Sequence, residues 1–151
     1  MKTTTGALAC SRHTDRSIDT CMANADLETR YRAYLDVLNE RRLDDLVHHV
    51  HDELSYNGET MTRGQYQDLI AADVTAIPDL IFDAHIIVAS GDQVACRLVF
   101  DCTPQQEFLG FSPNGKRLIF AEHVFYLFRA GRIAAVWSVI DRAAIAAQLR
   151  R

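Results

Sequence analysis

Apolar residues change their spacing near the middle of the chain. From Leu80 onward, runs rich in β-branched and aromatic residues alternate with turn-forming residues such as Gly131. Such runs are typical of antiparallel β-strands. They predict strands over Leu80–Ala89, Gln93–Thr103, Leu118–Phe128 and Arg132–Ile140.

Before Leu80 the apolar residues recur three and four positions apart, which predicts helices with one apolar face. Thr62 is expected to cap one of these helices, and Asp141 is expected to cap a closing helix after the last strand. The expected helices cover Ala25–Glu40, Leu43–Val50, Arg63–Thr75 and Arg142–Leu149, with a short strand at Glu53–Asn57. Helices followed by an antiparallel sheet indicate an α+β fold.

The chain has 151 residues, enough for one domain with a sizeable core. Residues 1–23 are polar and lack a periodic apolar face, so we expect a disordered extension before a single domain at residues 24–151, with Met22 as an alternative start. Because the formal net charge is −4, nucleic acid is not an expected partner.

No apolar run reaches the roughly 18 residues that a membrane span needs, so we expect no membrane partner. The four cysteines show no CxxC spacing, which favours free thiols in a cytoplasmic protein.

Both faces of the predicted sheet are apolar. Alternation along Leu118–Phe128 separates Phe120, Glu122, Val124, Tyr126 and Phe128 from Ile119, Ala121, His123, Phe125 and Leu127. The helices can cover only one face, so a second copy of the chain is the simplest cover for the other. We therefore predict a homodimer whose interface carries Ile133, Trp137, His123 and Phe125.

Several motifs in the second half resemble a known family. They are Glu107-Phe108-Leu109-Gly110, Pro113-x-Gly115-Lys116, Gly131-Arg132-Ile133, Trp137, Asp141 and Gln148-Leu149. Over about residues 25 to 149 the chain is similar to the SnoaL-like polyketide cyclases of the nuclear transport factor 2-like superfamily. The resemblance implies a cone-shaped fold, with N-terminal helices packed on a curved antiparallel sheet. It also implies a pocket for a small apolar organic ligand and chemistry without a cofactor, although this fold also hosts non-catalytic binders.

The sequence departs from the family at the positions that carry its catalysis. Ser138 stands where the resemblance places the acid/base aspartate of the last strand, and Val124 stands where it places a histidine. Pro104 replaces a further histidine before the Glu-Phe-Leu-Gly motif. A serine with an ordinary pKa cannot act as a general base near neutral pH, so the family's aldol cyclisation is in question for this chain.

The family's inward face, carried onto this sequence, directs Ser138 and Glu122 into the pocket. Burial among apolar walls would raise the pKa of Glu122, as an acid/base catalyst requires; a salt bridge to Arg97 is the alternative. Tyr126 and Tyr56 are candidate hydrogen-bond donors to an oxyanion, or else core tyrosines. Further expected contacts with the substrate are Ser138, Val124 and Phe120.

His123 is adjacent to Glu122, and neighbouring strand residues face opposite ways, so we assign His123 to the dimer face. His48, His49 and His51 lack further ligands at a familiar spacing, and we expect a solvated helix end rather than a metal site.

The sequence therefore predicts a cofactor-free isomerase, cyclase or dehydratase that transfers protons on a carbonyl-bearing, polyketide-like substrate. Glu122 is the predicted acid/base and Tyr126 the predicted donor. The alternative is a non-catalytic ligand-binding or structural homodimer of the same fold.

Overall fold

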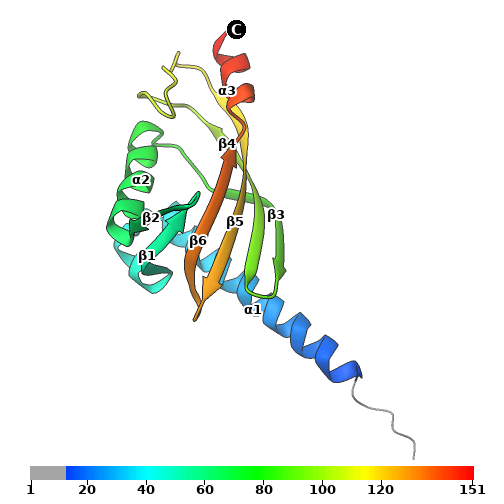
Figure 1. The fold of residues 1–151 in the computed structure, drawn as a ribbon. Coiled ribbons are helices and arrows are strands. Elements are labelled where there is room, and N and C mark those ends of the chain that lie inside the picture. The colour runs from blue at the N-terminus through cyan, green and yellow to red at the C-terminus, as the bar shows by residue number, and fades with distance from the viewer. Residues whose placement is uncertain (1–12) are drawn as a thin grey trace, which may run out of the picture.

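The body of the protein is a curved sheet of six strands, described by a computed structural model that covers residues 13–151. The strand order is β2-β1-β6-β5-β4-β3 (Figure 1). The strands are β1 Val50–Tyr56, β2 Glu59–Thr62, β3 Asp83–Ser90, β4 Gln93–Cys102, β5 Leu118–Arg129 and β6 Arg132–Ile140. β1 and β6 pair in parallel and the other neighbours pair antiparallel.

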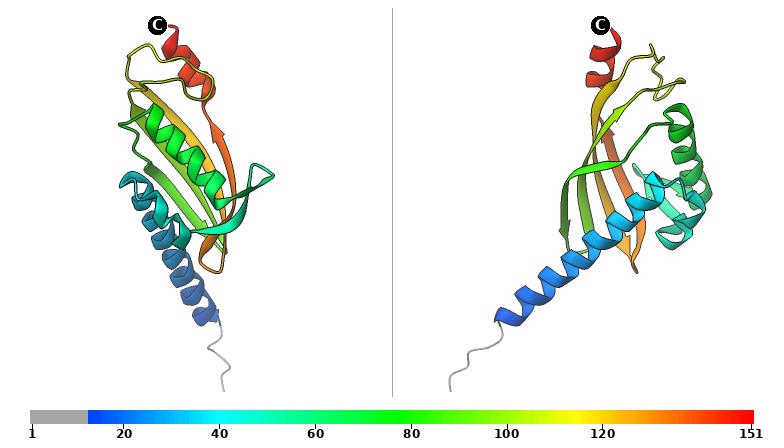
Figure 2. Two further views of the ribbon diagram at one scale, coloured as in Figure 1. Left: turned by 90° about the vertical axis from the view of Figure 1, so that its left-hand side faces the viewer. Right: turned by 180° about the vertical axis from the view of Figure 1, so that it is seen from behind.

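Helices cover one side of this sheet. They are α1 His13–Asn39, the short 3₁₀ helix η1 Leu43–His48, α2 Arg63–Ala76 and α3 Arg142–Leu149. Figure 2 shows α1 and α2 on the concave side of the sheet and α3 at its far end. The arrangement confirms the predicted α+β fold with helices packed on a curved sheet. Within residues 13–151, no helix has the length and apolar character to cross a membrane.

Two helix starts follow the predicted capping chemistry. The Gln65 N–H donates to Thr62 Oγ1 at 3.2 Å and the Thr62 N–H donates to Gln65 Oε1 at 2.9 Å, a reciprocal capping box at the start of α2. Asp141 caps α3 by accepting a hydrogen bond from the Ala144 N–H at 3.0 Å. Both predicted caps are confirmed.

α1 begins at His13, so the predicted helix start at Ala25 is wrong. Ile18 and Met22 are exposed, and Leu27 is the first buried residue after position 15. Extending a helix that is already packed costs far less than starting one, so these turns need no apolar face. Residues 13–23 of the predicted extension are therefore helical, and residues 1–12 lie outside the described residues.

The sequence reading also missed β2. Asn57 and Gly58 adopt positive φ angles of 49° and 88°, and they join β1 to β2 as a tight hairpin. Asn-Gly is the strongest short hairpin signal in a sequence, but β2 is only four residues long and partly polar.

Side-chain burial along β5 follows the predicted alternation. The inward residues are buried or half-buried: Leu118, Phe120, Glu122, Val124, Tyr126 and Phe128. On the other side, Ile119 and Phe125 are exposed. The concave face therefore belongs to the core, while none of the helices that the structure describes covers the outer face.

A β-bulge changes this alternation on β6. Phe128 pairs with Ile133 and Leu127 pairs with Ala135, which leaves Ala134 as an extra residue. Ile133 consequently faces the core and is 0% exposed. The assignment of Ile133 to the dimer face is wrong, because one inserted residue reverses the side to which a strand residue points. Trp137, which follows the bulge, does lie on the outer face.

Candidate active site

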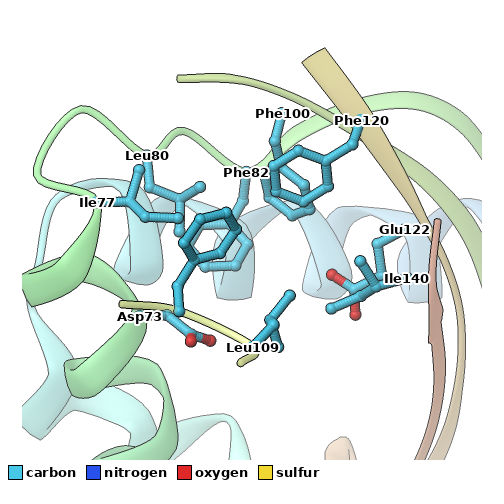
Figure 3. Close-up of a pocket in the computed structure, with 10 residues that line it drawn as sticks. Asp73, Ile77, Leu80, Phe82, Phe100, Leu109, Phe120, Glu122 and Ile140 are labelled. Carbon is cyan, nitrogen blue, oxygen red and sulfur yellow. The ribbon is translucent and has the colours of Figure 1, made fainter. Parts of the chain in front are cut away.

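Two adjoining pockets lie between α2 and the concave face of the sheet. The first, the phenylalanine pocket, has a cavity volume of about 40 Å³ and opens to solvent. Its apolar lining consists of Ile77, Leu80, Phe82, Phe100, Phe108, Leu109, Phe120 and Ile140 (Figure 3). The second, the tyrosine pocket, has a cavity volume of about 70 Å³ and is lined by Tyr34, Tyr56, Tyr66 and Tyr126 among aliphatic residues.

Four residues line both pockets: Asp73, Phe82, Glu122 and Ile140. Glu122 and Asp73 thus stand at the junction between an apolar compartment and one that is rich in hydroxyl groups. A ligand that spans the two compartments would contact both carboxyl groups.

Glu122 projects from β5 into this junction. The Ser138 hydroxyl donates a hydrogen bond to Glu122 Oε1 at 2.5 Å. Burial raises the pKa of Glu122, the Ser138 hydrogen bond opposes that rise, and the negative charge of Asp73 adds to it. Arg97 pairs across the strands with His123 on the outer face, and Glu122 has no ion-pair partner among residues 13–151. The salt-bridge alternative for Glu122 is therefore excluded in this structure.

Asn57 fixes the position of Ser138. The Ser138 N–H donates to Asn57 Oδ1 at 2.8 Å, and the Asn57 N–H donates to the Val136 carbonyl oxygen at 2.9 Å. These bonds hold β6 against the end of β1, so the Ser138 hydroxyl stays directed at Glu122. Ser138 is not among the lining residues of either pocket, and its contact is with the carboxyl group.

Asp73, which the sequence analysis missed, is the second carboxyl group of the cavity. It projects from the last turns of α2, and Figure 3 shows it across the pocket from Glu122 with Leu109 between them. The residue is exposed at the pocket mouth, but its apolar neighbours desolvate the carboxyl group and raise its pKa to about 6. Among the described residues, no side chain donates a hydrogen bond to it or forms an ion pair with it.

All five tyrosines of the chain gather at the other end of the cavity. The Tyr34 and Tyr66 hydroxyls are 2.5 Å apart, and the Tyr126 ring lies 4.9 Å from the Tyr31 ring and 5.7 Å from the Tyr34 ring. Burial raises the pKa of Tyr126 and Tyr66, so both hydroxyls stay protonated and able to donate hydrogen bonds.

Only some of the other residues predicted to contact the substrate line the two pockets. Phe120 lines the phenylalanine pocket, and half-buried Tyr56 lines the tyrosine pocket, where burial raises its pKa. Val124 is 1% exposed and lines neither of the two pockets. His123 lies on the outer face, as the alternation predicts.

The histidines near η1 have other surroundings. His51 Nε2 lies 2.7 Å from the Arg129 carbonyl oxygen, and the His49 ring lies 6.5 Å from the Tyr34 ring. Among residues 13–151, no cluster of three or more His, Cys, Asp and Glu side chains has a geometry that could hold a metal ion.

The sequence model of the family described as SnoaL-like polyketide cyclase matches residues 28–149. The chain belongs to this family. Membership supports a cyclase-type enzyme and agrees with the fold and with the resemblance of the C-terminal motifs.

Solved structures agree. A SnoaL-like polyketide cyclase from Agrobacterium tumefaciens is 44% identical, with a TM-score of 0.78 over 82% of this chain and 97% of that one. IdmH, a putative polyketide cyclase from Streptomyces antibioticus, is 22% identical, with a TM-score of 0.73 over 83% of this chain and 99% of that one. AclR, a putative hydroxylase from Streptomyces galilaeus, is 23% identical, with a TM-score of 0.71 over 84% of this chain and 97% of that one. The last two show the fold alone. A search of curated proteins found no match.

Proposed function

We propose that this protein is a cofactor-independent enzyme that enolises a small, largely apolar, carbonyl-bearing compound of the polyketide type. Enolisation is the proton-transfer step that cyclisation, isomerisation and dehydration of such compounds share. The observation that carries the proposal is the Glu122 carboxyl group, which stands between the two pockets with a raised pKa. A raised pKa makes a carboxyl group a stronger base when ionised and lets it keep its proton to a higher pH, so it is better suited to take and to give a proton.

The two pockets would bind different parts of the ligand. The phenylalanine pocket would hold the hydrocarbon part of the ligand by burying it against aromatic rings. Hydroxyls of Tyr56 and Tyr126 would face the carbonyl oxygen, where hydrogen bonds stabilise the negative charge of an enolate. Ser138 would hold the Glu122 carboxyl group in place rather than transfer the proton.

The test uses 2-tetralone, a bicyclic ketone whose α-hydrogens exchange with D₂O through its enol. Proton NMR follows the loss of the α-hydrogen signal, and saturation-transfer NMR reports binding of the same ketone. Glu122→Gln should slow enzyme-catalysed exchange by about 10²- to 10⁴-fold while binding persists, because it removes the titratable group and keeps the shape. Tyr126→Phe should cost less, on the order of a hundredfold.

The matched control is Glu59→Gln, which changes an exposed carboxylate on β2 and should exchange at the wild-type rate. Exchange by the wild type no faster than in buffer would contradict the proposal, as would a wild-type rate in Glu122→Gln. Binding of 2-tetralone without exchange would support the non-catalytic alternative.

We further propose that the enzyme acts as a homodimer. The outer face of the sheet exposes six large apolar side chains, each between 43% and 70% exposed: Ile86, Val88, Ile119, Phe125, Trp137 and Val139. A contiguous apolar surface on one sheet face is typical of an interaction site, and a second copy of the same face would cover it.

A further inference from the structure

Two carboxyl groups reach the cavity from opposite walls. Asp73 projects from helix α2 and Glu122 from strand β5, and both line the phenylalanine and tyrosine pockets. In Figure 3 the two groups lie on opposite sides of the pocket. A flat ligand between them would therefore have one carboxyl group on each side.

No cation balances the two groups inside the cavity. Within the part of the chain that the structure describes, the lining of the two pockets contains no lysine, arginine or histidine. The other titratable groups that face them are Tyr34 from α1, Tyr56 from β1, Tyr66 from α2 and Tyr126 from β5. Burial raises the pKa of each of these tyrosines, so they remain neutral over the range in which carboxyl groups titrate.

We propose that Asp73 is a second catalytic residue, acting as the base while Glu122 acts as the acid on a ligand bound between them. This inference rests on the proposed enolisation and deepens it by assigning the two halves of the proton transfer to two residues. Two like charges that face each other without a cation do not both ionise readily, so the pair carries one proton over a range of pH.

The surroundings of the two groups decide which one holds the proton. Asp73 is the more exposed residue of the two, and burial of its carboxyl group raises its pKa to about 6. Glu122 lies deeper, and the negative charge of Asp73 further raises its pKa. The Ser138 hydroxyl donates to Glu122 Oε1, which leaves Oε2 to carry the proton toward the ligand.

The proton count of the pair does not change in this step. The Asp73 carboxylate takes the hydrogen from the α-carbon of the ketone, and the C–H electron pair becomes the carbon–carbon double bond of the enol. The π electron pair of the carbonyl bond moves to its oxygen, which binds the proton that the Glu122 carboxylic acid gives up. Asp73 ends protonated and Glu122 ends ionised, so the enol forms without a proton from water.

The first test measures how fast the Asp73→Asn variant exchanges the α-hydrogens of 2-tetralone, compared with the wild type. Exchange should fall by about 10²- to 10⁴-fold with binding retained, and Asp73→Glu should recover part of the rate because it restores a carboxylate. Asp68→Asn changes a carboxylate on the same helix that lines neither pocket, and should leave the rate unchanged. Circular dichroism of each variant confirms that it is folded.

The second test does not depend on activity. Carbon-13 NMR of protein labelled at the aspartate and glutamate carboxyl carbons follows the titration of each group, and Glu122→Gln identifies the Glu122 signal. In Asp73→Asn the pKa of Glu122 should fall, because a facing negative charge has been removed. An unchanged Glu122 titration would overturn the pairing of the two groups.

The inference and the proposed function fail in different ways. Near-wild-type exchange in Asp73→Asn, together with loss of exchange in Glu122→Gln, would overturn the role of Asp73 and leave Glu122 as the acid/base. Near-wild-type exchange in Glu122→Gln would overturn the proposed function itself. Loss in both single variants, with no further loss in the double variant, is the expected result for residues that act as a unit.

Discussion

The two faces of the sheet are built from the same strands and from similar residues, yet residues 13–151 cover only one of them. On β5, Phe120 on the concave face is 5% exposed and Phe125 on the outer face is 53% exposed. Helices α1 and α2 lie on the concave side (Figure 2), where Phe120 also packs against the rings of Phe100 and Phe108. Apolar character therefore has two meanings in this protein: on one face it stabilises the fold and encloses the cavity, and on the other it is available for association.

The largest expected effect is on the free energy of unfolding, and it should distinguish inward from outward residues of β6. Ile133→Ala removes a side chain that is 0% exposed and should lower the free energy of unfolding by about 2–5 kcal/mol. Val139→Ala, on the same strand but 70% exposed, is the matched control. Urea unfolding measured by circular dichroism at low protein concentration compares them. A larger loss in Val139→Ala would mean that Ala134 is not the extra residue.

The outer face should respond through association rather than folding. Trp137→Ala removes the largest side chain of that face and should weaken dimerisation by at least about 2 kcal/mol, roughly thirtyfold in Kd. His123→Ala should also weaken the dimer while leaving exchange of 2-tetralone nearly unchanged, because His123 lies on the outer face, away from the cavity. Sedimentation velocity measures both variants. A wild-type protein that stays monomeric at micromolar concentration would contradict the dimer.

The smallest expected effect is on how the stability of the fold depends on pH, through the two carboxyl groups of the concave face. The pKa of Asp73 is about 6 in the folded protein, against an ordinary value of 3.8, so the folded state holds this proton more tightly than the unfolded chain does. The stability that Asp73 contributes is therefore fully present below about pH 4 and is lost as the pH rises through about 6. The raised pKa of Glu122 acts in the same direction.

Asp73→Asn should remove part of this decline. Urea midpoints measured between about pH 4 and pH 7.5 should fall less steeply in the variant than in the wild type, and Asp68→Asn should follow the wild type. Parallel curves for Asp73→Asn and the wild type would show that the Asp73 carboxyl group titrates alike in the folded and unfolded chain.

Local sequence patterns predicted most of the sheet. Period-two alternation shows which β5 residues share a face, and the resemblance to the SnoaL-like family implied that the face with Glu122, Phe120 and Tyr126 points inward. Alternation does not reveal an inserted residue, so Ile133 was assigned to the wrong face. It also does not show where a helix without an apolar face begins, which is why the start of α1 was misplaced.

Asp73 shows why part of the site could not be predicted from the sequence. In the sequence it is one of several polar residues along α2, and nothing local distinguishes it from Asp68. Only the packing of α2 across the concave face brings Asp73 to the same cavity as Glu122, which lies far along the chain. A carboxyl group whose role depends on a distant partner leaves no periodic signal.

The separation of aromatic residues between the two faces also gives the protein two independent optical reporters. Four of the five tyrosines line the cavity and the fifth, Tyr31, packs against Tyr126, whereas the single tryptophan, Trp137, lies 43% exposed on the outer face. Tryptophan emission excited at wavelengths that tyrosine does not absorb would respond to burial of the outer face, and tyrosine absorption would respond to a ligand that enters the cavity. Adding ketone to the protein would change the tyrosine absorption, and raising the protein concentration would change the tryptophan emission. Ligand binding and self-association could therefore be followed separately.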